Sequence, residues 1–324
     1  MNKHNFWQAL ITAALLTCTQ QAYSEVISLT ATPRASQTPI IIGVQKHFPD
    51  IAKKHGIPNG RVDIAYHRSS ADALNLVIKK EKTMTVASLP AIINFNAKNP
   101  GVLKFLSMTN VADAYLMCRQ DVKSIRDIKD RKLTISITSK HTSPHLIVKN
   151  IALQTFGNAD ALENNIVTMS GQQSQQILMS GAKGLDCALT GVPVQNQLEE
   201  AGLKKLYVQG QNTWPGWQNA YVVNQEWAAN NPAVVRALLE TFQYVTDQFN
   251  LDPEPYIKLF IEQEKLEIDS RTLTQHYRKS NNRAITKFSK PVMDMLRFSE
   301  QVGFSAANGL IDFEKNLVVD ASRL

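Results

Sequence analysis

The chain has 324 residues, of which 44% are hydrophobic and 19% are charged, a balance that is typical of a globular protein and not of a disordered one. Its formal net charge is +7 at pH 7, but the lysines and arginines are scattered and form no basic stripe with interleaved aromatic residues. We therefore expect no nucleic-acid partner. The positive balance is compatible with attraction of a small anion or an acidic surface, and equally with a solvated surface of slight positive bias.

The first 24 residues are predicted to be a secretory signal peptide. A positive start at Lys3 precedes the mostly apolar run 6–16, and Ala22-Tyr23-Ser24 has the pattern of a cleavage site. The apolar run is too short to span a bilayer, which needs roughly 20 residues. Cys18 follows a bulky threonine, so we expect no lipid anchor there. The mature chain is then exported, and it is long enough for two domains of ordinary size.

Two cysteines remain after cleavage, Cys118 and Cys187, and both lie in apolar, strand-like runs. In an oxidising compartment such a pair forms a disulfide bond, and two buried free thiols are the alternative. No metal site is expected, because no cysteine or histidine pair has the spacing of metal ligands. His141 and His145 are four residues apart, but no glutamate follows His141 and Pro144 lies between them.

One pattern recurs along the chain: a short β-rich run, a turn of Ser, Thr, Gly or Pro, and an amphipathic segment. In the first part, strands are predicted over 26–31, 62–67, 83–87 and 103–109, with helices over 38–55, 71–80 and 91–98. After a strand over 115–119 and a short helix, the pattern restarts, with strands over 133–137, 166–169, 185–189 and 205–209 and helices after Pro144, over 172–179 and from Pro193. A strand over 220–224 precedes helices over 232–250, 255–265, 270–279 and 291–302.

This alternation predicts an α/β protein with two similar lobes, each a mostly parallel sheet flanked by helices. The chain is expected to cross between the lobes near 110–114 and near 211–217. The predicted organisation is a signal peptide over 1–24, the first lobe over 25–112, the second lobe over 113–216, and a return to the first lobe with carboxy-terminal helices over 217–324. A ligand cleft between the lobes follows from this layout.

Polar residues just beyond the strand ends are the candidate ligand-binding residues, because ligands of open α/β sheets bind there. The clearest case is the turn 139–143, which separates a buried strand from a helix that opens with Pro144 and for which Ser143 is the predicted N-cap. Hydroxyl groups and helix-start amides bind small anions without a full positive charge. The candidates are Ser36, Gln37, Thr38, Arg68, Ser69, Ser70 and Ser88 in the first lobe and Ser139, His141, Thr142, Ser143, Gln172 and Thr190 in the second.

Each candidate also has a purely structural interpretation. Ser69, Ser88 and Ser143 are equally plausible as helix caps. His141 is more often a solvated turn residue than a ligand, and Arg68 either pairs an anion or bridges to an acidic neighbour. Two further candidates, Trp214 and Trp217, lie at the second crossing, where a tryptophan either stacks on an aromatic or apolar part of a ligand or packs the hinge.

The chain resembles the periplasmic solute-binding proteins of ABC importers, specifically the nitrate, sulfonate and taurine group. Three segments carry the resemblance: VKSIRDIKDRKLTISITSKHTSPH, SQQILMSGAKGLDCALTGVPVQNQLEEAG and VMDMLRFSEQVGFSAANGLIDFEKNLVVDASRL. The chain departs from the family before the third strand of the first lobe. A Gly-Asp pair is usual there, whereas this chain has Lys80-Glu81-Lys82-Thr83, and we expect the turn to be kept without glycine.

The resemblance implies the type II topology of periplasmic binding proteins, in which the strand after each crossover lies beside the third strand of the lobe it enters. That topology places 115–119 next to 185–189, and therefore Cys118 near Cys187. It also implies the function: a periplasmic monomer without a cofactor captures a small solute, sulfonate-like or carboxylate-like, by hinge closure and delivers it to an ABC permease in the inner membrane. The alternatives are a binding protein for a thiamine-pyrimidine precursor, and a periplasmic sensor or co-receptor module of the same fold.

Catalysis is not expected. The chain lacks a G-x-S-x-G nucleophile motif and a G-x-x-x-x-G-K phosphate loop, and its histidines are scattered singly. Some proteins of this fold are enzymes that make a thiamine pyrimidine. Those enzymes carry a cysteine-rich motif, and this chain does not contain it.

Overall fold

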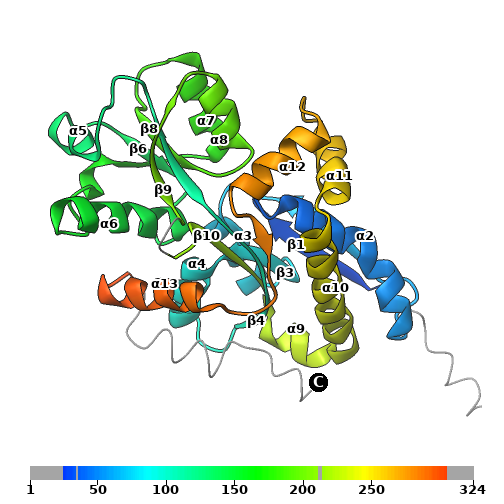
Figure 1. The fold of residues 1–324 in the computed structure, drawn as a ribbon. Helices are drawn as coiled ribbons and strands as arrows, with labels where there is room; N and C mark the ends of the chain where they lie inside the picture. Colours follow the sequence, from blue (N-terminus) through cyan, green and yellow to red (C-terminus); the bar gives the residue numbers. More distant parts are fainter. Residues whose placement is uncertain (1–24, 34–35, 211–213, 305–324) are drawn as a thin grey trace, which may run out of the picture.

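The computed structural model describes residues 25–33, 36–210 and 214–304. The predicted signal peptide and the last part of the carboxy-terminal segment lie outside these residues. Within the described part of the chain, no helix combines the length and the apolar character that a membrane crossing requires. Two β-sheets organise the structure, and we call the part built on each sheet the first and the second lobe (Figure 1).

The six-stranded sheet of the first lobe has the order β11-β4-β10-β3-β1-β2. Its strands are β1 (Val26–Ala31), β2 (Arg61–Tyr66), β3 (Met84–Ser88), β4 (Leu103–Ala112), β10 (Trp217–Asn224) and β11 (Arg283–Ala284). β1 pairs in parallel with β2 and β3, whereas β10 lies antiparallel between β3 and β4. The strands β1 to β4 therefore all run in one direction, and the strand that returns from the second lobe runs against them.

The five-stranded sheet of the second lobe repeats this arrangement, with the order β7-β6-β8-β5-β9. Its strands are β5 (Ala114–Cys118), β6 (Ile135–Ile137), β7 (Ile166–Thr168), β8 (Cys187–Thr190) and β9 (Lys204–Gln209). β5 lies antiparallel between β8 and β9, as β10 does between β3 and β4. In both lobes the strand that has just crossed over lies beside the third strand of the lobe it enters, which is the type II topology that the family resemblance implies.

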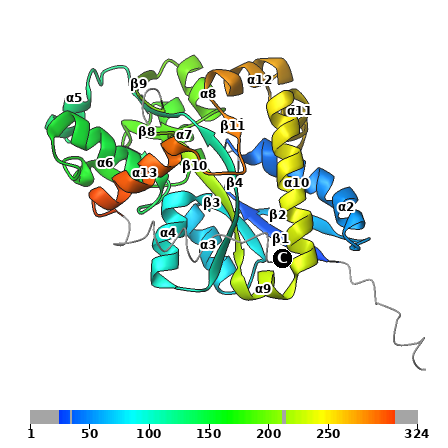
Figure 2. The same ribbon diagram turned by 60° about the horizontal axis from the view of Figure 1, so that its bottom comes forward.

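Helices cover both faces of the sheets. They are α2 (Thr38–Lys54), α3 (Ser70–Ile78), α4 (Leu89–Lys98), α5 (Ile125–Asp130), α6 (Ser143–Phe156), the 3-10 turn η1 (Glu163–Asn165), α7 (Gly171–Ser180), α8 (Val194–Glu200), α9 (Gln225–Asn230), α10 (Pro232–Leu251), α11 (Glu254–Glu264), α12 (Ser270–Lys279) and α13 (Lys290–Gln301). α10 packs along α2, and α13 passes beside α6 of the second lobe (Figures 1 and 2). Sequence analysis did not predict α9 and β11.

Two apolar clusters form the core, one on each side of the sheets. Successive side chains of β10 point to opposite faces of the sheet. Tyr221 and Val223 lie in the cluster that contains α2, α10 and α11. Ala220 and Val222 lie in the cluster that contains α3, α4 and α6. Each cluster continues from the first lobe into the second. The packing therefore holds the lobes to each other as well as each lobe to its own helices.

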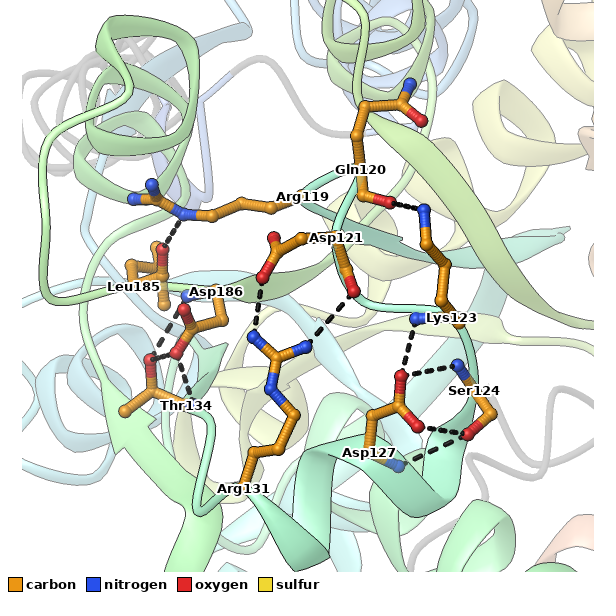
Figure 3. A network of polar contacts seen from close by, with 10 residues as sticks. All are labelled: Arg119, Gln120, Asp121, Lys123, Ser124, Asp127, Arg131, Thr134, Leu185 and Asp186. Carbon is orange, nitrogen blue, oxygen red and sulfur yellow. Dashed lines mark hydrogen bonds and ion pairs between the residues drawn. The ribbon is translucent and has the colours of Figure 1, made fainter.

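A reciprocal polar contact joins the first and third strands of each lobe, one residue before their pairing begins. In the second lobe the Asp186 carboxylate accepts hydrogen bonds from the backbone N–H (2.8 Å) and the hydroxyl (3.0 Å) of Thr134, and the Thr134 hydroxyl accepts one from the Asp186 backbone N–H at 3.1 Å (Figure 3). In the first lobe the same contact is made by Ser28 and Thr83, whose backbone N–H groups donate to each other's hydroxyl oxygens. Thr83 thus replaces the aspartate that the family pattern predicts, and Lys80 makes the preceding turn with a φ of +60°.

The strand that enters the second lobe is fixed at its far end by covalent and polar contacts. Cys118 of β5 lies directly opposite Cys187 of β8, and the two form a disulfide bond. Next to it, Arg119 Nε donates to the Leu185 carbonyl at 2.7 Å. Ser124 and Asp127 then form a capping box that begins α5 (Figure 3). This end of β5 is held firmly while its other end meets the first lobe.

Candidate functional site

The chain crosses between the lobes through two closely packed connections. β4 passes into β5 through Asp113 alone, and this buried carboxylate accepts a hydrogen bond from Asn281 Nδ2 at 2.9 Å. Burial raises the pKa of Asp113, although the hydrogen bond from Asn281 and the positive charge of Arg283 oppose the shift. Gly210 and Gly216 of the return connection lie so close to Asp113 and to the next residue that a Cβ has no room at either position. These two crossings join the lobes and leave little space at either connection.

We call the region where the carboxyl ends of β3, β6 and β8 meet the start of β10 the interlobe interface. Ser88 ends β3, and its hydroxyl accepts from the backbone N–H of Ser143, the first residue of α6 in the second lobe, at 3.5 Å. The Ser143 hydroxyl donates to Oε1 of Gln218 on β10 at 3.2 Å. The structure thus brings predicted site residues of both lobes into direct hydrogen-bonding distance, with all three side chains buried.

The first-lobe side of this interface is a connected set of buried amides and hydroxyls. Asn110 Nδ2 donates to the Ser36 hydroxyl at 3.1 Å and to Asn282 Oδ1 at 2.9 Å. Asn219 Nδ2 donates to Gln37 Oε1 at 3.2 Å and to Asn110 Oδ1 at 3.1 Å. These bonds fix the orientation of Ser36 and Gln37, two of the predicted residues. Thr38, the third of that group, is fully buried at the start of α2.

Three buried polar atoms at the interlobe interface have no hydrogen-bond partner among the described residues: Ser139 Oγ, Thr190 Oγ1 and Trp217 Nε1. Ser139 follows β6, Thr190 ends β8, and Trp217 begins β10. An ideal Cβ on Gly191 would lie 2.7 Å from Trp217 Nε1, so the indole lies against that glycine, next to Thr190. The three atoms are hydrogen-bond donors in an environment where unpaired polar groups are costly. These three atoms are therefore the candidate ligand contacts of the interface.

Several predicted residues have structural roles instead. Arg68 is exposed and pairs with Asp72 at 3.1 Å, and Ser69 caps α3 by accepting from the Asp72 backbone N–H. Trp214 is buried, and its ring packs at 5.8 Å from Phe298 of α13.

Ser70 accepts from the Ser88 backbone N–H, and Gln172 is exposed on α7. For Arg68, Ser69 and Trp214 these contacts match the structural interpretations of the sequence.

The turn Ser139–Ser143 differs from the predicted one in its N-cap residue and in its hydrogen bonds. The N-cap of α6 is Thr142 and not Ser143, and the Thr142 hydroxyl donates to the Ser139 carbonyl at 2.7 Å instead of capping the helix. His141 is exposed and has a φ of +60°. Its backbone N–H donates to Nδ1 of His145 at 3.1 Å. The prediction of Ser143 as N-cap was wrong by one residue because the tight turn at His141 already ends at Thr142.

Charged groups also contact this turn and the start of α6. Glu163 accepts from His145 Nε2 at 2.8 Å and from Lys140 Nζ at 2.6 Å. Burial favours the protonated form of Glu163, but the hydrogen bonds from Lys140 and His145 outweigh it and lower the pKa of Glu163 to about 2. Burial lowers the pKa of His145 and outweighs the opposite effect of Glu163.

Across the part of the chain that the structure describes, no three His, Cys, Asp or Glu side chains form a metal-binding group.

Sequence analysis missed four residues of the interface: Asn110, Gln218, Asn219 and Asn282. Gln218 and Asn219 lie in β10, which begins three residues before the predicted strand. Polar residues at the start of a strand were attributed to the loop, although they are buried. The available signal was the pair of adjacent amides between the tryptophan and a strongly apolar run. Asn110 and Asn282 come together only through the pairing of β4 and β11.

Comparison with known proteins places the chain in a family. A family model described as NMT1/THI5 like matches residues 53–254, which is more than half of the chain. No curated protein matches the chain in sequence.

Solved structures of low sequence identity share the fold. A Candida albicans protein described as having the generic periplasmic binding protein fold superimposes with a TM-score of 0.69 over 91% of this chain and 96% of its own, at 11% identity. The alkanesulfonate-binding protein SsuA from Xanthomonas axonopodis pv. citri, bound to MOPS, gives a TM-score of 0.66 over 87% and 94%, at 9% identity. The nitrate-binding protein NrtA from Synechocystis PCC 6803 gives 0.68 over 93% and 88%, at 12% identity. The chain belongs to the NMT1/THI5-like family and has the two-lobed fold of the periplasmic binding proteins.

Proposed function

We propose that the protein is the extracytoplasmic solute-binding component of an ABC importer, and that it captures a small anion of the sulfonate class at the interlobe interface. The observation that carries this proposal is the set of three buried donors without protein partners, Ser139 Oγ, Thr190 Oγ1 and Trp217 Nε1. Neutral hydroxyl and N–H groups bind oxyanions without a full positive charge. The structural similarity to sulfonate- and nitrate-binding proteins supports the same ligand class.

The proposed mechanism is hinge closure. A ligand that contacts donors of both lobes binds the closed state more tightly than the open state, and this difference in affinity shifts the population towards closure. The second-lobe donors are Ser139 and Thr190, and the donor from the strand of the first lobe is Trp217. Release of the contact between Ser143 and Ser88 opens the interface to solvent. The closed, monomeric protein then docks on a membrane permease in the periplasm, and no chemical step occurs.

A thermal-shift screen tests the ligand class. Ethanesulfonate, nitrate, benzoate and an aminopyrimidine are added separately to the mature protein, since a ligand that binds only the folded state raises the melting temperature. We expect ethanesulfonate to stabilise the protein and to be recovered unchanged. Turnover of the ligand contradicts a binding role. Loss of ethanesulfonate uptake after deletion of the gene distinguishes an importer component from a sensor of the same fold.

A thiamine-pyrimidine precursor is the second candidate ligand. The NMT1/THI5-like family model and the half-buried ring of Trp217 favour it, because an aromatic heterocycle stacks on an indole. Stabilisation by the aminopyrimidine without any response to ethanesulfonate or nitrate supports this candidate over the anion.

A further inference from the structure

The turn Ser139–Ser143 is attached to α6 through one buried side chain, His145. We propose that His145 is a positioning residue, which holds this turn in its ligand-binding shape only while its ring is neutral, so that affinity falls in acid. The inference rests on the proposed function of the turn. It concerns a residue that contacts none of the three unpaired donors in the described hydrogen bonds.

The geometry fixes the protonation state of the ring. Nδ1 of His145 accepts the backbone N–H of His141 at 3.1 Å, so this nitrogen carries no proton. Nε2 lies 2.8 Å from Glu163 Oε2, and the carboxylate requires a donor there. Only the neutral tautomer with its proton on Nε2 satisfies both contacts. The ring is 3% exposed, so water does not replace either partner.

The bond to His141 supports a conformation that is otherwise unfavourable. His141 has a φ of +60°, the left-handed region that side chains other than glycine rarely adopt. In a capping box, the side chain three residues into the helix returns to an N–H at the helix start. His145 occupies that place in α6 and reaches one residue further back. Without it, the left-handed backbone at His141, in the middle of the turn Ser139–Ser143, loses its hydrogen bond to α6.

Charged and aromatic groups from four elements face this ring. Glu163 comes from η1, and Lys149 lies one turn further along α6. Lys140 bridges to Glu163, and Lys98 of α4 acts on His141. The rings of His141 and Phe304 pack at 5.7 and 5.2 Å from His145. Protonation places a second N–H on the ring, directed at the His141 N–H, and the hydrogen bond between them is lost.

The sign of the pH effect follows from this contact. Burial lowers the pKa of His145 in the folded protein, so the neutral, acceptor form predominates at pH 7.5. As pH falls through the His145 pKa, the charged form accumulates and the turn is released. Affinity for a ligand that needs the ordered turn then falls by up to about tenfold per pH unit, the limit for one linked proton.

Two amide variants separate the two ring nitrogens. The side-chain oxygen of Asn lies near the position of Nδ1 and accepts at any pH, so His145→Asn keeps the bond to His141. The nitrogen of Gln lies near Nε2, so His145→Gln keeps the bond to Glu163 and loses the acceptor. His55→Asn is the matched control, because His55 also bonds a glutamate, Glu240, at 2.7 Å, on the surface at the end of α2.

The experiment measures two quantities over a pH series from 7.5 down to 4.0: the exchange protection factor of the His141 amide by NMR, and the affinity for ethanesulfonate, which stays ionised throughout. We expect wild type and His55→Asn to lose both quantities progressively as the pH falls through the His145 pKa, by up to about tenfold per pH unit. His145→Asn should keep both at each pH, and His145→Gln should be low at each pH. Equal protection of the wild-type His141 amide across the whole pH series overturns the inference, as does a wild-type pH response in His145→Asn. If ethanesulfonate does not bind, the proposed ligand class is wrong, and the amide protection alone decides the role of His145.

Discussion

At the scale of single residues, three buried polar atoms of the interlobe interface carry the proposed ligand contacts. The hydroxyls of Ser139 and Thr190 and the indole N–H of Trp217 are buried without protein partners among the described residues. A buried donor left unpaired costs about 1–3 kcal/mol. Nearby buried polar groups, such as Asn110 and Asn219, are fully engaged with one another. We interpret this contrast as a separation between residues that build the interface and residues that contact a ligand.

Thr190→Val tests this separation. Valine keeps the shape of threonine, and no protein hydrogen bond is lost, so we expect the free energy of unfolding to stay within about 0.5 kcal/mol of wild type. Affinity for ethanesulfonate should fall about fivefold, which corresponds to one neutral hydrogen bond of about 1 kcal/mol. Thr85→Val is the control, because the Thr85 hydroxyl donates to the Thr30 carbonyl inside the sheet at 3.1 Å. It should lose stability by urea denaturation and keep its affinity; the reverse pattern contradicts the assignment.

Gly191→Ala tests the position of Trp217. The backbone at Gly191 is not in the left-handed region, so alanine is tolerated, but its methyl group would lie 2.7 Å from Trp217 Nε1. We expect the indole to move, its fluorescence to shift, and affinity for ethanesulfonate to fall at least about fivefold. Gly171→Ala is the control, because nothing lies near the added methyl group at that position. An unchanged affinity together with a shifted fluorescence excludes Trp217 from the site.

The sequence pattern predicted which hydroxyl-bearing residues follow the strand ends, but it did not predict the buried amides beside them. Ser88, Ser139, Ser143 and Thr190 follow strand ends, and parallel strands bring their carboxyl ends to one edge, so local pattern was sufficient. Asn110 was missed because its role depends on Asn219 and Asn282, which lie more than one hundred residues away in the chain. Pairings of that kind are determined by sheet order and are not encoded in a local pattern.

At the scale of elements, charged and polar side chains of α6 and of the turn before it bind a carboxylate of the second lobe. Lys140 and His145 both bond Glu163, and this carboxylate therefore ties the turn to η1 from two directions. The strand–turn–helix order of this region was predicted, and so was the proline near the helix start. The N-cap was displaced by one residue because the left-handed His141 shortens the turn, and side-chain contacts to Glu163 do not follow from spacing.

The pH dependence of stability tests the bonds of Glu163. The folded pKa of about 2 lies below the ordinary value of 4.5, so the unfolded chain binds more protons between these values. The stability from this group is therefore fully present above about pH 5 and is lost as pH falls towards 2. We expect Glu163→Gln to flatten this part of the curve of unfolding free energy against pH, measured by urea denaturation. Glu226→Gln, at the exposed pair with Lys80, should leave the curve as in wild type.

At the scale of the whole molecule, the two lobes repeat one strand order and are joined by two close-packed crossings. The reciprocal contact between the first and third strands is also repeated, with Thr134 and Asp186 in one lobe and Ser28 and Thr83 in the other. The fold was predictable because alternating strands and helices leave few topologies open. The departure from the Gly-Asp pattern in the first lobe changed the residues of this contact and not its geometry.

The tight crossings predict a specific effect of blocking the hinge. Gly216 lies against the start of β5, with no room for a Cβ. If ethanesulfonate closes the lobes, the radius of gyration of the wild-type protein in small-angle X-ray scattering should decrease when it is added. We expect Gly216→Val to force the connections apart and to abolish this decrease. Gly202→Ala, at a surface turn where nothing lies near the added methyl group, is the control for general destabilisation. An equal ligand-induced decrease in both variants argues against closure at this hinge.

Isothermal titration calorimetry with ethanesulfonate decides whether the interlobe interface is a ligand-binding site. The comparison is between wild type and the double variant Ser139→Ala/Thr190→Val, which leaves the Thr142 hydroxyl and its bond to the Ser139 carbonyl in place. We predict one ligand per wild-type chain, with affinity in the double variant reduced at least about tenfold and an unchanged melting temperature. Equal affinity in the two proteins, or the absence of binding to wild type, contradicts a sulfonate site at this interface.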